Sequence, residues 1–151
     1  MLWSHRRVLP VLLVALFVGG CQSEAERGDR PPPPPPPPPV KTMTAHATGI
    51  KVYLEQSLLK EKVTTPGTWG YDGSDPAYRV TLIEFTIDGT NVPVPPESYA
   101  NLFNVVDLIL SEQDGGWLIS IHGAAAESGR YQANYFVKDG AVSGPDIKAT
   151  D

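Results

Sequence analysis

Cysteine is almost absent from this sequence, and other gaps in its composition limit what the protein can be. Cys21 is the only cysteine, so the chain cannot form an internal disulfide, and three histidines leave no set of zinc ligands. The chain contains no GxGxxG, phosphate-loop, HExxH or GxSxG motif. Asp72 and Asp75 lie in one loop, but the twelve-residue spacing of a calcium loop is missing. We therefore expect neither a metal ion nor a cofactor.

Basic residues are also scarce. The chain has 12 of them against 17 acidic residues, which gives a formal net charge of −5. Arg6 and Arg7 both lie within the first 20 residues, so a chain beginning at residue 21 has a charge of −7. Nucleic acids and anionic membrane surfaces attract clustered positive charge, and no such cluster follows residue 20. We expect no nucleic-acid partner.

The apolar run at residues 8–18 is too short to span a membrane, because a spanning helix needs about 20 apolar residues. Two arginines precede this run and two glycines follow it, which is the order of parts in a secretory signal peptide. The sequence "VGGC", Val18 to Cys21, resembles the lipobox of bacterial lipoproteins. The alternative is an ordinary secretory signal followed by an incidental cysteine.

The lipobox resemblance implies a lipid anchor. In that family the signal, here residues 1–20, is cut off and the cysteine, here Cys21, receives palmitate-type acyl chains. Two or more chains hold a protein stably on a membrane, whereas one does so only marginally. Gln22, where an aspartate would imply retention in the inner membrane, implies the outer membrane of the bacterial cell envelope. The resemblance covers residues 1–22 and implies nothing about the fold of the rest.

Nine consecutive prolines, Pro31–Pro39, follow the cysteine. They favour a polyproline II helix, which rises about 3.1 Å per residue and so spans roughly 28 Å here. The flanking segments 22–30 and 40–48 are polar and are predicted to be disordered. We therefore interpret residues 21–48 as a linker that holds a domain away from the lipid. The alternative is a ligand for a proline-binding module.

Residues 49–151 are predicted to form one globular domain. Alternating apolar residues indicate a strand from residue 49 to about 55, although a helical stripe also fits. A Gly- and Pro-rich loop over 64–78 precedes a hairpin that turns at Asp88–Gly89. Residues 96–106 have apolar positions at helical spacing and predict one short helix.

The last third predicts a meander of three antiparallel strands. Their apolar positions alternate and should face one side of the sheet: Val106, Leu108, Leu110, Trp117, Ile119, Ile121, Tyr131, Ala133, Tyr135 and Val137. Residues 141–151 are expected to trail away. The order β, ββ, α, βββ predicts a small α+β domain with an antiparallel sheet and one covering helix. A small antiparallel β-roll or barrel is the alternative.

Two groups of residues are candidates for a binding surface. Ser120, His122 and Arg130 belong to the polar face of the meander, where His122 is expected near Arg130. Ser120 and His122 are too far apart for direct activation of a nucleophile, and a solvated sheet face is the simpler interpretation of all three. Trp69, Tyr71 and Tyr78 flank the 64–78 loop and suit a sugar or a protein, or else cap the end of the core.

The sequence therefore predicts a lipid-anchored envelope protein that presents a small binding or accessory domain on a polyproline stalk. Its partners are expected to be the membrane, through Cys21, and an envelope protein or polysaccharide. We expect no catalytic residue. The alternatives are an inhibitor or immunity-type protein and, less favoured, a hydrolase of envelope components.

Overall fold

The computed structural model describes residues 31–64, 67–73, 77–125 and 129–150. The chain divides into two units, Met1–Pro35 and Pro36–Asp151, and all the described strands belong to the second. Within the described residues the second unit has eight strands and no α-helix. The prediction of an antiparallel sheet is confirmed, whereas the α+β class is wrong because the covering helix is missing.

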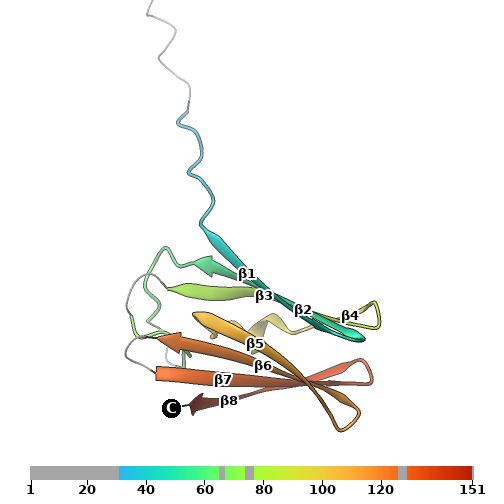
Figure 1. Ribbon diagram of the computed structural model, residues 1–151. Helices are drawn as coiled ribbons and strands as arrows, with labels where there is room; N and C mark the ends of the chain where they lie inside the picture. Colours follow the sequence, from blue (N-terminus) through green and yellow to red (C-terminus); the bar gives the residue numbers. More distant parts are fainter. Residues whose placement is uncertain (1–30, 65–66, 74–76, 126–128, 151) are drawn as a thin grey trace, which may run out of the picture. The chain divides into compact units, whose positions relative to one another are not determined.

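Four strands form the first sheet (Figure 1). They are β1 (Val40–Ala47), β2 (Ile50–Leu58), β3 (Tyr78–Ile87) and the short β4 (Thr90–Val92), in the order β1-β2-β3-β4 with every pair antiparallel. Ile50, Val52 and Leu54 alternate into the core, which confirms the predicted strand. The hairpin at Asp88–Gly89 is also confirmed, because both residues have the positive φ angles that a tight two-residue turn requires.

The second sheet is an antiparallel meander of four strands. It contains β5 (Val105–Gln113), β6 (Gly116–Ala125), β7 (Gly129–Lys138) and β8 (Ala141–Thr150), in the order β5-β6-β7-β8. The predicted inward positions on β6 and β7 are confirmed, except that Trp117 is only partly buried: Ile119, Ile121, Tyr131, Ala133, Tyr135 and Val137. The prediction for Val106 is wrong, because 62% of this residue is exposed.

The predicted helix over 96–106 is replaced by a single 3₁₀ turn at Pro96–Ser98. Downstream of it one local bond remains, from the Leu102 N–H to the Tyr99 carbonyl, and further backbone bonds join this segment to others. The Val80 N–H donates to the Leu102 carbonyl, and the Phe103 N–H donates to the Trp69 carbonyl. Phe103 is nevertheless buried, as are Tyr99 and Leu102. The apolar spacing thus predicted burial correctly but not the secondary structure.

Residues 40–47 form strand β1, so the prediction that segment 40–48 is disordered is wrong. Val40, Thr42 and Thr44 favour extended backbone, and Met43 packs against the core. Pairing with β2 begins before the strand itself, because the Leu58 N–H donates to the Pro39 carbonyl at 3.0 Å. The prolines therefore continue directly into an edge strand of the first sheet.

The expected C-terminal tail is also a strand. Residues 141–150 form β8, which pairs with β7 along its length, apart from a register shift between Asn134 and Phe136. Val142 and Ile147 pack against the core from this strand. Val142 and Ile147 are five residues apart, so simple alternation would place them on opposite faces, and the register shift explains why both reach the core.

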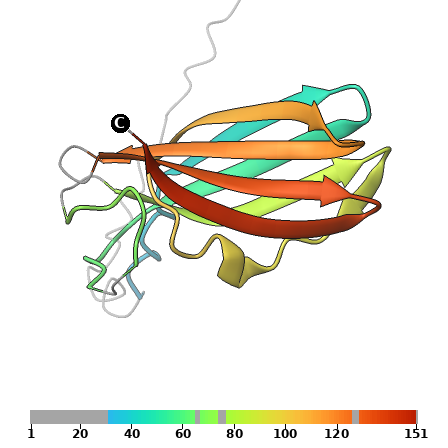
Figure 2. The same cartoon turned by 90° about the horizontal axis from the view of Figure 1, so that it is seen from below.

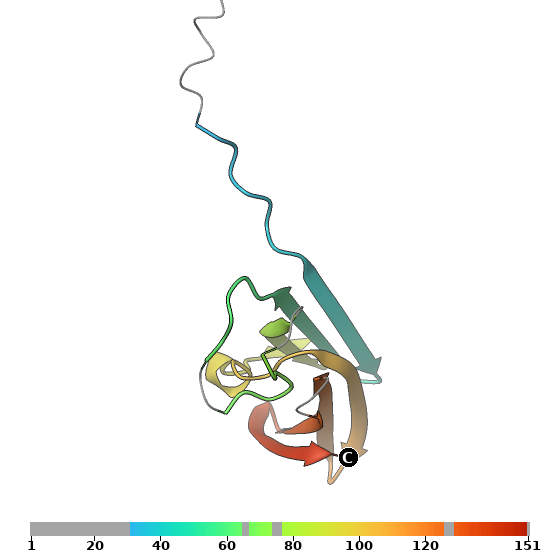
Figure 3. The same cartoon turned by 90° about the vertical axis from the view of Figure 1, so that its left-hand side faces the viewer.

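The two sheets pack face to face around one core, as seen from below and along the strands (Figures 2 and 3). The first sheet contributes mainly aliphatic side chains and Phe85, whereas the second contributes Tyr131 and Tyr135. The sheets remain separate, so the barrel alternative is not found. Strands β1 and β5 lie side by side at one corner of the sandwich.

Candidate functional site

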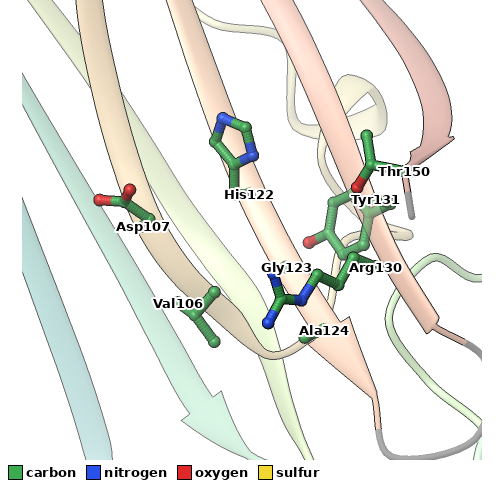
Figure 4. A pocket seen from close by; sticks show the side chains of 8 residues that line it. All are labelled: Val106, Asp107, His122, Gly123, Ala124, Arg130, Tyr131 and Thr150. Carbon is green, nitrogen blue, oxygen red and sulfur yellow. The ribbon is translucent and has the colours of Figure 1, made fainter.

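A hollow of about 560 Å³ opens on the outer face of the second sheet (Figure 4). It extends from β5 across β6 and β7 to the end of β8. Its volume lies within the range of roughly 300–1,000 Å³ that is usual for ligand pockets. The residues that line it are Val106, Asp107, His122, Gly123, Ala124, Arg130, Tyr131 and Thr150. His122 and Arg130 are thus brought together with residues that the sequence analysis did not single out.

A β-bulge at the start of β5 forms one side of the hollow. Val105 pairs with Gly123 and Asp107 pairs with His122, so Val106 is an extra residue without a partner on β6. Val105 points into the core, while Val106 and Asp107 are both exposed. A bulge commonly redirects side chains in this way beside functional sites. The bulge explains why the predicted alternation fails at Val106.

Gln56, on β2 of the first sheet, holds this bulge in place. Its side chain is only 2% exposed. Its amide nitrogen donates to the Val105 carbonyl at 3.0 Å, and its amide oxygen accepts from the Val105 N–H at 2.8 Å. One buried amide therefore satisfies both backbone groups of the residue next to the hollow. Sequence reasoning missed Gln56 because a glutamine in a predicted strand gives no sign that it is buried.

Gly123 and Tyr131 form the floor of the hollow. The Tyr131 ring lies so close to Gly123 that a Cβ atom at residue 123 would collide with it. The Tyr131 hydroxyl donates to the Phe103 carbonyl at 2.9 Å. Burial raises the pKa of Tyr131 far above its ordinary value, so the hydroxyl stays neutral. The floor is a fixed, uncharged layer beneath the polar side chains.

Three charged or titratable side chains surround the hollow without pairing with one another. In Figure 4 the Arg130 side chain extends from β7 above Gly123 and Ala124, while Asp107 stands on β5. One Asp107 oxygen accepts from the Leu108 N–H at 2.8 Å. In the part of the chain that the structure describes, no hydrogen bond or ion pair joins Asp107, His122 and Arg130.

The register of β6 and β7 differs from the expected one by two residues. His122 pairs with Gln132 rather than with Arg130, because the strands extend to Ala125 and Gly129 and the connecting loop is shorter than expected. Arg130 reaches the hollow from a position opposite Ala124. His122 and Arg130 are therefore neighbours through the hollow and not through direct pairing.

Ser120 lies outside the lining and belongs to a separate polar network. Its hydroxyl donates to the Asn134 side-chain oxygen at 2.9 Å, and the Gln132 amide donates to that same oxygen at 2.8 Å. Gln132 also donates to the Ser120 hydroxyl at 3.3 Å. Ser120 is only 7% exposed. The hydroxyl of Ser120 is thus engaged in this network, while His122 lines the hollow.

The three predicted loop aromatics each pack on a different part of the domain. Trp69 is partly buried, with its ring centroid 6.3 Å from that of Tyr131. The Tyr71 ring is buried and stacks on Phe103 at 5.2 Å. The Lys41 ammonium lies 3.6 Å from the centroid of the Tyr78 ring. These contacts favour the capping interpretation over a shared sugar-binding surface.

Three further observations concern the predicted lipid anchor, membrane-spanning helices and metal ligands. Cys21 lies outside the described residues, so the predicted lipidation stays a prediction. Among the residues that the structure does describe, no helix has the length and apolar character to cross a membrane. Nor do these residues include a group of three His, Cys, Asp or Glu side chains that could hold a metal ion.

Comparison of the chain with models of protein families, with curated proteins and with solved structures finds no match. The function must therefore be argued from the residues of the site itself.

Proposed function

We propose that this protein is a lipid-anchored component of the bacterial envelope that presents a ligand-binding β-domain on a polyproline stalk. The anchor is supported by "VGGC" at Val18 to Cys21, and the stalk by Pro31–Pro39. The domain acts by binding a partner from the envelope and not by catalysis.

The hollow on the second sheet is the observation that supports binding. It offers Asp107, His122 and Arg130 to a ligand, and none of these is committed to an ion pair within the described part of the chain. Hydrogen-bonded strands hold all three at fixed positions. A site built on rigid strands loses little conformational entropy when a ligand binds.

The same geometry does not favour hydrolysis. A general base of the histidine type needs a group that orients its ring and a nucleophile within hydrogen-bond reach. Asp107 bonds to the Leu108 N–H instead of to His122. The nearest hydroxyl on the same strand, that of Ser120, is engaged by Asn134 and Gln132. We therefore assign His122 to ligand binding.

Labelling with a radioactive fatty acid tests the anchor. We expect label on the wild-type protein and none on Cys21→Ala, with Ser23→Ala as a matched control that keeps the label. Equal label on wild type and Cys21→Ala would exclude the lipid anchor and leave the domain's binding function to be judged separately.

Nuclear magnetic resonance of the histidine rings tests binding. We expect a soluble extract of envelope proteins and polysaccharides to shift the His122 ring signals, which are assigned by their loss in His122→Gln. His46, on β1 of the other sheet, is an internal control whose signals should not move. An unchanged His122 spectrum at saturating extract would overturn the binding function.

A further inference from the structure

We infer that the hollow on the second sheet binds a short zwitterionic peptide, about two residues long, with small side chains. This inference rests on the proposed binding function and names the ligand class. Three features of the lining support it: a site for an anion, a site for a cation and a small apolar surface between them.

The anion site lies on the side of β6 to β8. Arg130 is exposed and lines the hollow together with His122 and the Thr150 hydroxyl. An arginine guanidinium binds a carboxylate through two parallel hydrogen bonds, which makes it more selective for that group than a point charge. A C-terminal carboxylate would thus satisfy Arg130 and lie within the same hollow as His122 and Thr150.

The cation site is Asp107 on β5. This exposed side chain lines one side of the hollow beside the bulge, and one of its oxygens accepts from the Leu108 N–H. The carboxylate keeps further acceptor positions, because each ionised carboxylate has about four lone-pair sites. An N-terminal ammonium, with three donors, is a matching group.

Val106 and Ala124 supply the apolar surface between the two charges. Val106 is 62% exposed only because the bulge places it outside the core. Little side-chain volume fills this part of the lining, since Gly123 has no side chain and Ala124 has only a methyl group. Methyl-sized side chains of a ligand can pack on this surface.

The spacing of the charges sets the ligand length. Asp107 pairs with His122 and Arg130 pairs with Ala124, so their Cα positions are divided by two strand spacings, about 10 Å, and by two residues along the strand, about 7 Å, which together give about 12 Å. An extended dipeptide of about 7 Å, with one hydrogen bond of about 3 Å at each end, covers about 13 Å, which is close to this separation. A single amino acid is too short to join both groups, and a longer peptide overshoots them.

A simple ion fits the hollow less well than a zwitterion. An anion at Arg130 would meet the negative charge of Asp107, and a cation at Asp107 would meet the positive charge of Arg130. A ligand that carries both charges turns each of these repulsions into an attraction. Charge complementarity therefore favours the dipeptide.

Alanyl-alanine is the probe for the experiment, added to the full chain in a neutral detergent. Its L,L form represents peptides from proteins, and its D,D form represents peptides of bacterial cell walls. We expect at least one form to shift the His122 ring signals to saturation and to leave those of His46 unchanged. N-acetyl-alanyl-alanine and alanyl-alanine amide each lack one charge and should bind about tenfold or more weakly.

Charge-removing variants assign each end of the peptide. Asp107→Asn should lose the preference for alanyl-alanine over its N-acetyl form, and Arg130→Gln should lose the preference over the amide. Both side chains are exposed, so both variants should unfold at the wild-type denaturant concentration. Lys148→Gln, on β8 outside the hollow, is the matched control and should keep both preferences.

Two outcomes would overturn the inference. One is that neither stereoisomer shifts His122, and the other is that the charged and blocked peptides bind equally well. If the envelope extract shifts His122 in the same preparation, only the ligand class is wrong. If the extract also leaves His122 unchanged, the proposed binding function fails with it.

Discussion

The two sheets each contain a β-bulge near the start of a strand, and the two bulges place their neighbouring side chains differently. In the first sheet Thr81 is the extra residue, and Val80 and Ile83, three positions apart, both reach the core. In the second sheet Val106 is the extra residue, and it is exposed beside the hollow. The same backbone device serves packing in one sheet and shapes the hollow in the other.

The two bulges are connected through Gln56. This residue pairs with Val80 beside the first bulge, and its side chain bonds to Val105 beside the second. The first sheet therefore supports the geometry of the hollow without contributing a residue to its lining. Changes in the first sheet should therefore lower the free energy of unfolding most, whereas changes in the second sheet should mainly alter the hollow.

Removal of β1 should have the largest effect. A chain that begins at Thr48 lacks this strand, loses the contact of Met43 with the core and leaves the β2 edge unpaired. We expect it to be less stable by about 5 kcal/mol or more, a large part of the 5–15 kcal/mol available to a domain. Urea denaturation measures the difference.

A chain that begins at Pro36 is the control for this truncation. It keeps β1 and the bond from Leu58 to the Pro39 carbonyl, so its urea midpoint should equal that of the longer chain. Equal midpoints for the chains that begin at Pro36 and Thr48 would restore the predicted domain boundary at residue 49.

Gln56→Leu should have the next largest effect. It leaves the Val105 N–H and carbonyl buried without side-chain partners, and each unsatisfied group costs about 1–3 kcal/mol. We expect a loss of about 2–6 kcal/mol in the free energy of unfolding, measured by urea denaturation. The His122 signals should also move, because His122 pairs with Asp107 beyond the bulge.

Glu55→Gln is the matched control, because Glu55 precedes Gln56 on β2 and points to the other face of the sheet. It should change stability by less than about 0.5 kcal/mol. If Gln56→Leu behaves like this control, the two hydrogen bonds to Val105 do not hold the bulge.

The sequence predicted burial better than it predicted secondary structure. Alternation identified the inward residues of β6 and β7, because the period of two is set by the pleat of any strand. Phe103 was correctly expected to be buried, but its helical spacing was misleading. The Asn104 side chain bonds to the Tyr78 N–H and the Gly70 carbonyl, so contacts distant in sequence fix this segment.

The hollow was predictable only in part. His122 and Arg130 could be placed on one face from their strand positions, but Asp107 enters the same hollow through a bulge. Two adjacent valines, Val105 and Val106, were the available signal, since one of an adjacent pair must leave the apolar face of a strand. Strands β1 and β8 were missed because small and polar residues dominate both segments and β8 also contains Pro145, and pairing with their neighbours outweighs that composition.

The smallest expected effect concerns the ionisation of a buried tyrosine in the second sheet. The second sheet carries Tyr135 in the core, where its hydroxyl donates to the Ser98 carbonyl at 3.0 Å. Burial raises the pKa of Tyr135 from 10.0 to about 12. Its contribution to stability is thus complete below pH 10, because the tyrosine is neutral in both states there. As the pH rises from 10 to 12, the unfolded chain ionises first and the contribution is lost, by about 1.4 kcal/mol per pH unit.

Tyr135→Phe should cost about 1 kcal/mol at pH 7 through the lost hydrogen bond and should weaken this alkaline slope. Urea denaturation at intervals from pH 7 to 11.5 measures both effects. An unchanged slope in Tyr135→Phe would mean that Tyr135 ionises equally easily in the folded and unfolded chain, and hence that its hydroxyl is not held in the core of the second sheet.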